Sequence, residues 1–525
     1  MERATWMVGL WLAMALFSPK GYSTALPPIP DKPEAEIFKD VPAPWRDYMV
    51  KARSAERMSD PLQRCLAYPD MPGNRWPAAH AEAHCRYHAI KVIGLDEIAG
   101  YLDRGEIDVL EKRLDGYLSK HFSDTDFGED IHNVFGLFTV VDEKTDRISS
   151  DWLKRAPSSA YANLARASFY EGSAWKARGN ASVSETPRDN FRRMTGFVDQ
   201  AIPLLQAAIA VKPNLMPAYS ILLDIASLDS RTQLEREAIA GGIAQDPACL
   251  ELANKRMRSL QPRWGGSYEE MLALSAELSR HVARRPQLAI HVAAPYGDRG
   301  DRLLADDKYT AEAAEILEIA IRTGSNEAHL HDAGDIAFNI DGALRDGWKG
   351  LALLLQEARF GEGDAWANRT IGRRLVRSEP EWSLVHAMRA ATLDPGDAYG
   401  EYLLGAGFYN ANRFDDAERH YRLAMVDDEQ KQASLKELSM MWLYDSKLEP
   451  ERAVAKAKPY IDRLLVEYPH YGAAWLMRLD AASLIDRRVD PALLKDFLKY
   501  ADRKDPWQDK AAKEIEEAFR KAGIK

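Results

Sequence analysis

Three histidines spaced four residues apart are the first feature of this sequence that could carry chemistry. They lie in and just after the stretch HAEAHC, which begins at position 80. On a helix, residues at i, i+4 and i+8 share one face, so His80, His84 and His88 are candidate metal ligands. Neutral imidazoles in this arrangement suit zinc or copper. The alternative interpretation is a surface helix without a metal, fastened by a disulfide between Cys65 and Cys85.

The surrounding pattern does not match the common zinc-enzyme motifs. In the zincin motif the glutamate directly follows the first histidine, whereas Glu82 is two residues on and points to another side of the helix. A nucleobase deaminase needs a Pro-Cys-x-x-Cys segment downstream, and the only later cysteine is Cys249. We expect Cys249 to be an unpaired, buried apolar residue. If the histidines do hold a metal, the alternative function is a metal-dependent hydrolase that uses His80, His84 and His88.

A second candidate site is the loop that begins with Arg263 and Trp264 and continues with two glycines. The glycines would let the backbone approach a partner closely, Trp264 offers a stacking face, and Arg263 offers a bidentate donor. Trp175 and Arg178 permit the same interpretation. Alternatively, Trp264 fills the core between helix pairs and the glycines turn the chain, and this is the interpretation that the sequence favours.

The elements that must position these residues are helices, and the clearest of them lie in the stretch 397–428. This stretch has the pattern of two helices joined by a tight turn at 410–413. Small residues stand where the two helices would cross and larger ones fill the seam, as in a tetratricopeptide hairpin. These packing residues are Leu404, Gly405, Phe408, Ala417, Tyr421 and Ala424. Such a hairpin cannot bury its apolar face alone and must stack on neighbours.

Weaker signals of the same kind extend through most of the chain. Pro213 and Pro247 stand 34 positions apart, which is the tetratricopeptide period. We expect an irregular insertion from Gly172 to Asn180, and a helix over 191–211 that is broken or kinked at Pro203. Strand patterns are nearly absent. The predicted fold is therefore all-α: an α-α superhelix of the tetratricopeptide-like solenoid type, preceded by a helical N-terminal domain.

Two irregular blocks resemble an uncharacterised bacterial family, a domain of unknown function. The blocks are 157–162 together with 175–179, and the Pro-Arg-Trp-Gly-Gly-Ser motif at 262–267. The resemblance covers about 95–280 and implies no catalytic residues. The region 310–521 resembles tetratricopeptide and Sel1-like repeats, and that resemblance implies protein–protein binding.

The N-terminus predicts a secretory signal peptide. Arg3 is followed by an apolar run from Thr5 to Phe17, and small residues precede a cleavage site after Ala25. The run is short for a membrane span, which needs roughly 20 apolar residues, and an uncleaved anchor is the alternative. We expect no later segment to span a membrane. The predicted divisions are a signal peptide (1–25), a Pro-rich lead-in with the Cys65/Cys85 helical segment (26–94), a helical domain of unknown function (95–295) and a tetratricopeptide/Sel1-like repeat region (296–525).

Composition narrows the function classes. The net charge of −10 argues against bulk nucleic-acid binding, which needs a basic surface. The sequence therefore predicts a periplasmic or secreted, non-catalytic helical-repeat protein without a cofactor, which binds a protein or peptide partner in the cell envelope. The residues expected at the binding face are Tyr402, Tyr409 and Asn412, with Arg263 and Trp264 as further candidates.

Overall fold

The protein is all-α. A computed structural model describes residues 26–123, 128–305, 309–486 and 490–522, and within these ranges it contains 26 α-helices, six short helices of other types and no β-strand. The predicted signal peptide, 1–25, lies outside the described residues. The short stretch at 137–141, whose pattern is ambiguous between helix and strand, forms a 3-10 helix, η2 (Leu137–Thr139), and an extended exit.

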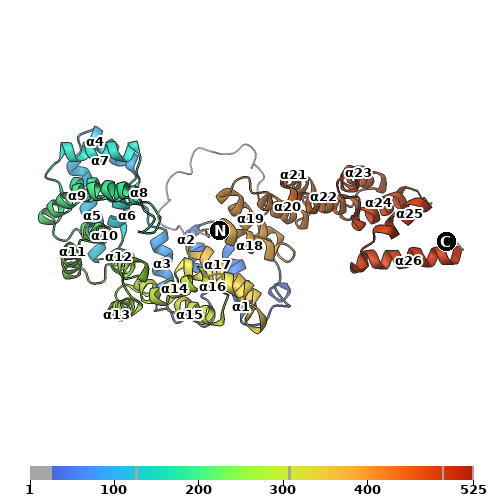
Figure 1. The fold of residues 1–525 in the computed structure, drawn as a ribbon, viewed down its shortest axis with the longest axis horizontal. Coiled ribbons are helices and arrows are strands. Elements are labelled where there is room, and N and C mark those ends of the chain that lie inside the picture. The colour runs from blue at the N-terminus through green and yellow to red at the C-terminus, as the bar shows by residue number, and fades with distance from the viewer. Residues whose placement is uncertain (1–25, 124–127, 306–308, 487–489, 523–525) are drawn as a thin grey trace. The chain divides into compact units, whose positions relative to one another are not determined.

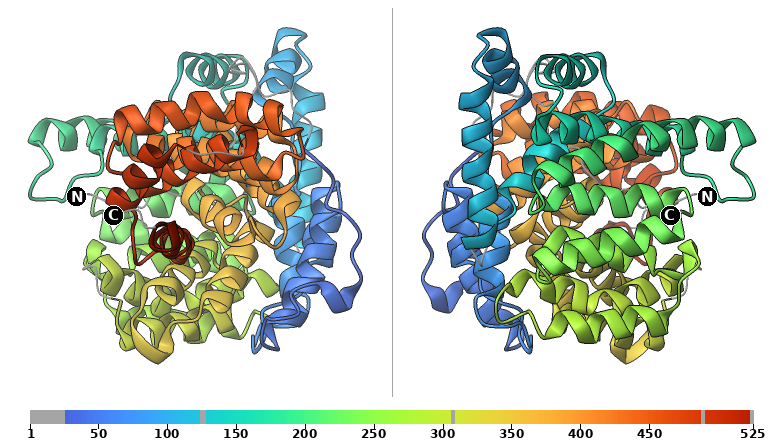
Figure 2. Two further views of the ribbon diagram at one scale, coloured as in Figure 1. Left: turned by 90° about the vertical axis from the view of Figure 1, so that its right-hand side faces the viewer. Right: turned by 90° about the vertical axis from the view of Figure 1, so that its left-hand side faces the viewer.

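The helices form two compact units, which can be followed in Figure 1 and Figure 2. Among the described residues, the larger unit lies within Pro42–Gly361, and the smaller unit lies within Met1–Val41 and Glu362–Lys525. The helices of the larger unit are α1 (Trp45–Glu56), α2 (Pro61–Ala67), α3 (His80–His88), α4 (Leu95–Asp103), α5 (Ile107–Ser123), α6 (Asp130–Gly136), α7 (Glu143–Arg155), α8 (Ala160–Arg178), α9 (Arg188–Val211), α10 (Met216–Leu228), α11 (Thr232–Gln245), α12 (Leu250–Ser259), the 3-10 helix η3 (Pro262–Trp264), α13 (Tyr268–Ser279), α14 (Ala289–Ala305), α15 (Ala311–Thr323), α16 (Glu327–Asn339) and α17 (Gly347–Phe360). Those of the smaller unit are α18 (Ala365–Leu375), α19 (Pro380–Leu393), α20 (Ala398–Asn410), α21 (Phe414–Ala424), α22 (Asp428–Met440), the π-helical segment η6 (Met441–Asp445), α23 (Pro450–Glu467), α24 (Gly472–Ile485), α25 (Pro491–Tyr500) and α26 (Pro506–Ala522).

Consecutive helices pack in pairs, and one helix of each pair belongs to an inner layer. The closest pairs include α8 with α9, α16 with α17, and α20 with α21. In the larger unit the even-numbered helices from α8 to α16 each pack against the next even-numbered helix, and the same holds for α18 to α26 in the smaller unit. Among the described residues, successive odd-numbered helices from α9 onwards do not pack closely on one another. A stack of helix pairs curves towards the layer whose members lie closer together. The even-numbered helices from α8 onwards therefore form the inner layer of each unit, as in a tetratricopeptide-like solenoid.

The hairpin predicted at 397–428 is confirmed as α20 and α21. All six packing residues predicted from the sequence are buried. A Cβ at Gly405 would lie 2.6 Å from a ring carbon of Tyr421, so only glycine lets the two helices cross this closely. Asp397 caps α20 by accepting the backbone N–H of Gly400 at 2.9 Å. Asn412 closes the turn in the left-handed region, at φ 59°, which asparagine tolerates better than most residues.

The predicted irregular insertion from Gly172 was wrong, and the helix is not broken at Pro203, which was one of the two alternatives predicted there. The stretch from Gly172 is not an irregular insertion, because α8 continues through it to Arg178. Gly172 is helical and stands where α8 touches the backbone of Thr139. Likewise α9 continues through Pro203 without a break. A proline removes only one hydrogen bond from a helix, and the long packing of α9 along α8 compensates for this loss.

Contrary to the sequence-based expectation, α9 is long and apolar enough to cross a membrane by length and composition. It begins with Arg188 and Asp189 and carries Arg192 and Arg193 in its first two turns. In the structure its buried residues, Met194, Val198, Ala201, Leu205 and Ala208, belong to the large core of the unit. The same apolar stripe that satisfies the membrane criterion is thus used to pack this helix on its neighbours.

Candidate functional site

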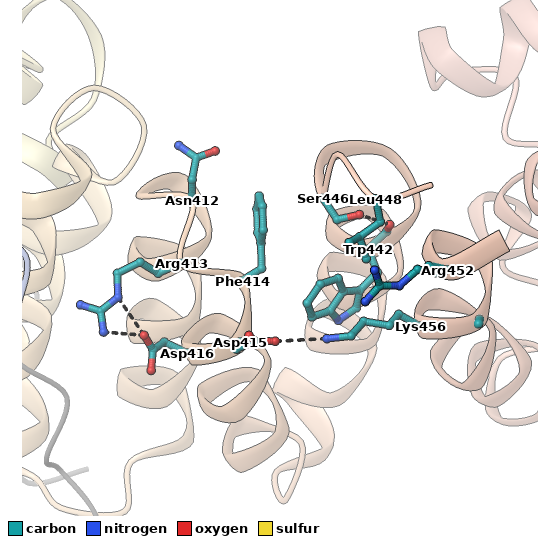
Figure 3. Close-up of a pocket in the computed structure, with 11 residues that line it drawn as sticks. Asn412, Arg413, Phe414, Asp415, Asp416, Trp442, Ser446, Leu448, Arg452 and Lys456 are labelled. Carbon is teal, nitrogen blue, oxygen red and sulfur yellow. Dashed lines mark hydrogen bonds and ion pairs between the residues drawn. The ribbon is translucent and has the colours of Figure 1, made fainter. Parts of the chain in front are cut away.

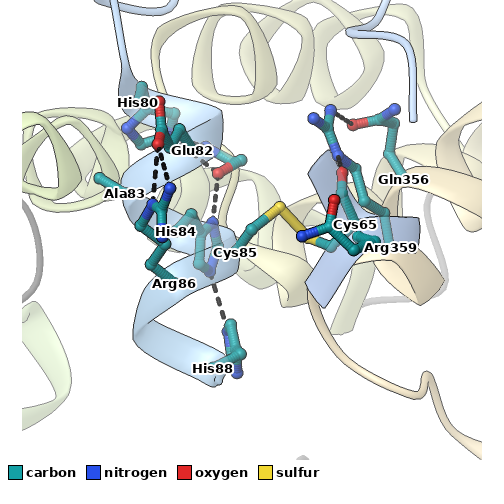
Figure 4. The surroundings of a disulfide bond; sticks show 12 residues. Cys65, His80, Glu82, Ala83, His84, Cys85, Arg86, His88, Gln356 and Arg359 are labelled. Carbon is teal, nitrogen blue, oxygen red and sulfur yellow. Dashed lines mark hydrogen bonds and ion pairs between the residues drawn. A yellow bond between two sulfur atoms is a disulfide. The ribbon is translucent and has the colours of Figure 1, made fainter. Parts of the chain in front are cut away.

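The histidine helix α3 presents a cluster of possible metal ligands. The Nε2 atoms of His84 and His88 lie 3.0 Å apart. Glu327, the first residue of α16, brings its Oε1 to 3.2 Å from His84 Nε2 and 2.9 Å from His88 Nε2. Together these three side chains form a group of atoms that could hold one ion. Figure 4 shows the histidines along α3, next to the disulfide.

His80 points to different partners. Its Nδ1 lies 2.8 Å from the carbonyl oxygen of Pro286, and its Nε2 lies 2.8 Å from Ser325 Oγ. Burial, followed by the neighbouring His84, lowers the pKa of His80 to about 3, so this imidazole is neutral. Both ring nitrogens are already used. The structure therefore groups Glu327, and not His80, with His84 and His88.

The surroundings hold α3 firmly in place. Cys65 of α2 and Cys85 of α3 are joined by a disulfide (Figure 4). Arg359 of α17 donates to the carbonyl oxygen of Cys65 at 2.8 Å. The ring of Phe360 stacks on His84, with centroids 4.2 Å apart and planes at 7°. Covalent and packing contacts thus fix the helix that carries the histidines.

The loop residues Arg263 and Trp264 lie in η3, directly after the inner-layer helix α12. Trp264 is 38% exposed, so it does not fill the core, contrary to the interpretation that the sequence favours. Its ring meets that of Trp175 edge to face at 5.8 Å. The guanidinium groups of Arg178 and Arg263 lie 5.5 Å and 5.8 Å from the Trp264 ring centroid. The structure therefore joins the two sequence blocks into one aromatic and cationic surface.

Beneath this surface lies an ion network that the sequence did not reveal. Lys255 Nζ lies 3.3 Å from both Glu171 Oε1 and Asp224 Oδ2, and Arg258 lies 3.3 Å from the other oxygen of Asp224. Trp175 donates its indole N–H to Asp224 at 2.7 Å. These groups come from the inner-layer helices α8, α10 and α12, which are far apart in the chain. No local spacing could have identified them, since each is an ordinary charged residue within its own helix.

The two carboxylates of this network titrate differently. Burial raises the pKa of Glu171, because Lys255 only partly offsets the loss of hydration. Burial acts on Asp224 in the same direction, but Lys255 and Arg258 outweigh it and hold the pKa of that carboxyl below its usual range. The network therefore keeps Asp224 ionised and favours a proton on Glu171.

Tyr402 and Tyr409 lie on the inner-layer helix α20 of the smaller unit. Tyr402 is half-buried, and its ring lies 6.2 Å from Tyr399 and 5.5 Å from Tyr421. Burial, followed by the charge of Glu437 on α22, raises the pKa of Tyr402 to about 12. Tyr409 is also within the electrostatic influence of Glu437. Glu437, on the next inner helix, is thus within electrostatic range of both predicted tyrosines.

Pairs of tyrosine and aspartate repeat along this layer. Tyr409 donates its hydroxyl to Asp445, and Tyr444 donates to Asp480 at 2.6 Å. In both pairs the partners are 36 residues apart, about one repeat length. They link α20 to η6 and η6 to α24. We call Tyr409, Tyr444, Asp445 and Asp480 the tyrosine–aspartate ladder.

Asn412 lies at the turn that follows α20, with its backbone N–H bonded to the carbonyl oxygen of Tyr409 at 2.9 Å. It lines a groove of about 600 Å³ between α21 and α23, shown in Figure 3. Phe414 and Trp442 face the groove with ring centroids 6.1 Å apart. Lys456 crosses it, with Nζ 3.6 Å from the Trp442 ring centroid and 3.1 Å from Asp415 Oδ1. The groove adjoins the tyrosine–aspartate ladder, because Phe414 also meets Tyr409, with ring centroids 6.2 Å apart.

The solved structures compared with this chain are distantly similar to it. No protein-family model matches any part of the chain, and no curated protein sequence matches it. Among solved structures, the TPR domain of P58(IPK) is 12% identical with a TM-score of 0.24, covering 71% of this chain and 93% of that one. The APC/C hetero-tetramer Cut9-Hcn1 is 11% identical with a TM-score of 0.30, covering 91% and 98%. Both TM-scores lie below 0.5, so the description of the fold rests on the helix packing of this chain.

Proposed function

We propose that this protein is an exported, non-catalytic helical-repeat protein that binds a protein or peptide segment of the cell envelope on the inner layer of its smaller unit. The observation that carries the proposal is the tyrosine–aspartate ladder with Tyr402 and Glu437 beside it. Inner layers of stacked helix pairs form extended binding surfaces. Tyrosine is enriched at protein interfaces because it offers a large, rigid contact area together with a hydroxyl group.

The charges on this surface favour a partner segment with basic side chains. Burial raises the pKa of Glu437 and of Asp480, because both carboxylates lose hydration in the layer. Lys436 and Arg377 lower the pKa of Glu437 without cancelling the effect of burial. A lysine or arginine of a bound segment would stabilise the ionised form of both carboxylates and gain a charge-assisted hydrogen bond.

Export is supported by two features. The N-terminal sequence has the pattern of a secretory signal peptide. The disulfide between Cys65 and Cys85 is of the kind that persists in oxidising compartments such as the bacterial periplasm. A periplasmic or secreted location follows from these two features as part of the proposal.

Site-specific photo-crosslinking in cells tests the binding face directly. A photoreactive amino acid replaces Tyr444, which is 40% exposed on the inner layer and bonds Asp480. The matched control replaces Tyr460, which makes the same kind of hydroxyl-to-carboxylate bond to Glu418 but lies on the odd-numbered helix α23. We expect a crosslinked partner from position 444 and none from position 460.

A second measurement fixes the chemistry of the partner. Binding of the crosslinked segment to purified protein is measured with Glu437→Gln and with Glu418→Gln. We expect the inner substitution to weaken binding by about tenfold, which corresponds to the loss of about one charge-assisted hydrogen bond. Equal crosslinking at both positions, or unchanged affinity in Glu437→Gln, would rule out this face as the binding surface.

A further inference from the structure

Three possible ligand atoms converge within the larger unit, where the start of α16 meets α3. They are His84 Nε2, His88 Nε2 and Glu327 Oε1, and their mutual distances are 3.0, 2.9 and 3.2 Å. The two histidines are four residues apart on α3, so they share a face. Glu327 reaches them from the first turn of α16.

These distances match the spacing of ligands around one transition-metal ion. Bonds of about 2.05 Å at angles between about 90° and 109° separate neighbouring ligand atoms by about 2.9 to 3.3 Å. All three observed distances fall in this range. Two imidazoles and one carboxylate are also a donor set that zinc accepts when water completes the coordination.

The site has one closed side and one open side. His84 is almost fully buried, with 3% of its side chain exposed, and Phe360 stacks on its ring. His88 and Glu327 remain 32% and 20% exposed. A metal ion held by the three atoms would therefore lie at the surface of the larger unit, with room for water on the solvent side.

A chain of hydrogen bonds sets the tautomer of His84. His80 Nδ1 must donate to the carbonyl oxygen of Pro286, since a carbonyl cannot donate, and this leaves His80 Nε2 as an acceptor. The hydroxyl of Ser325 then donates to His80 Nε2 at 2.8 Å, and the backbone N–H of Ser325 points to the same nitrogen at 3.3 Å. Ser325 Oγ consequently accepts from His84 Nδ1 at 2.6 Å. His84 Nε2 is left as an acceptor, open to a metal ion or to the N–H of His88 Nε2 at 3.0 Å.

The lone pair of this nitrogen lies 3.2 Å from a carboxylate oxygen. Two acceptors so close repel each other, and a metal ion bound to both would relieve the repulsion.

The arrangement around the ligands is the one that metal sites use. A metal-binding histidine usually donates its second ring N–H to a fixed acceptor, which orients the ring. Ser325 supplies this acceptor for His84. The disulfide at Cys85 fixes the turn of α3 between the two ligands. Arg359, the nearby cation, is already paired with Asp70 at 2.7 Å.

We propose that His84, His88 and Glu327 bind one divalent transition-metal ion, with zinc as the favoured ion and water as the remaining ligand. This site is independent of the partner-binding face proposed above. It differs from the set expected from the sequence by taking Glu327 from α16 in place of His80.

The test is zinc binding by the full chain, expressed without a histidine tag and stripped with a chelator. Zn²⁺ binding is titrated by calorimetry, and bound metal is measured by mass spectrometry. Mg²⁺, which imidazole ligands do not favour, serves as the control ion. We expect one zinc per chain and no binding of Mg²⁺ at this site. Co²⁺ in place of zinc is expected to give the visible absorption of a site with nitrogen and oxygen ligands.

Variants locate the site. His88→Ala and Glu327→Gln remove ligands that are partly exposed, so the fold should survive, and we expect zinc affinity to fall by about 100-fold or more. Ser325→Ala removes only the orienting acceptor and should cost about 10- to 100-fold. Glu82→Gln on the same helix and His470→Ala in the smaller unit are the controls, and both should bind zinc as the unsubstituted chain does. No stoichiometric zinc in the unsubstituted chain, or equal affinity in all five variants, would overturn the proposal.

Discussion

Two glycine-to-alanine substitutions in neighbouring helices should have opposite effects on stability. Gly172 lies within α8 and Gly196 within α9. A Cβ at Gly172 would lie 2.0 Å from the carbonyl oxygen of Thr139 and 2.8 Å from its carbonyl carbon. A Cβ at Gly196 would meet no atom within 4 Å. Comparing the same substitution at the two positions therefore isolates the effect on stability of the close contact between α8 and η2.

The magnitudes follow from two opposing terms. Alanine is more favourable than glycine in a helix interior by about 1 kcal/mol, and both sites gain this term. At Gly172 the contact must open by roughly 1.4 Å to restore an ordinary separation, and the obstacle is backbone, which cannot rotate away. Inserting an extra methyl group into such a contact costs about 2 to 3 kcal/mol. We therefore expect Gly172→Ala to lower the free energy of unfolding by about 1 to 2 kcal/mol, and Gly196→Ala to raise it by about 1 kcal/mol.

The assay is urea unfolding followed by far-UV circular dichroism, with hydrogen exchange of peptides from α8 and α9 to assign the transition to the larger unit. Gly172→Ala should shift the midpoint to lower urea and speed exchange in α8, and Gly196→Ala should shift it to higher urea. A Gly172→Ala variant as stable as the unsubstituted chain would refute the reasoning. It would mean that the contact at Thr139 opens without cost.

Three other variants have definite expected outcomes. Replacing Cys65 and Cys85 by serine removes a cross-link between residues 20 apart, and should lower the stability of the larger unit by about 3 kcal/mol in denaturant unfolding. Asp397→Ala removes the cap of α20 and should cost about 1 kcal/mol in the same assay, measured on the smaller unit. Burial raises the pKa of Glu171 from 4.5 to about 8, so the folded protein holds a proton there that the unfolded chain releases, and this group makes stability fall between about pH 4.5 and 8. In thermal unfolding measured across this pH range, Glu171→Gln should make stability depend less on pH. An unchanged slope of stability against pH would contradict the assignment of this proton to Glu171.

The sequence by itself determined the helices and their pairing in the best repeat. Small residues at Gly405 and Ala417, with aromatic residues at Phe408 and Tyr421, are readable because a hairpin packs residues that are close in the chain. The alternation of apolar and polar positions fixes which face of a helix is buried. Proline and glycine were less reliable guides. Gly172 lies inside a helix, and glycine stands there because the backbone of Thr139 approaches closely. That approach cannot be predicted from the local sequence.

The sites were decided by the tertiary structure. Of the three histidines that share a face of α3, His80 turns to Ser325 and Pro286, because α16 and η4 (Pro286–Leu288) approach that end of the helix. Glu327 joins the other two from a distant helix, and nothing in its own neighbourhood marks it. The network around Lys255 likewise depends on three helices that meet only in the stack. Helical periodicity indicates which face of a helix is buried. The identity of the group across a long-range contact depends instead on how separate helices dock. This information is absent from any single stretch of chain.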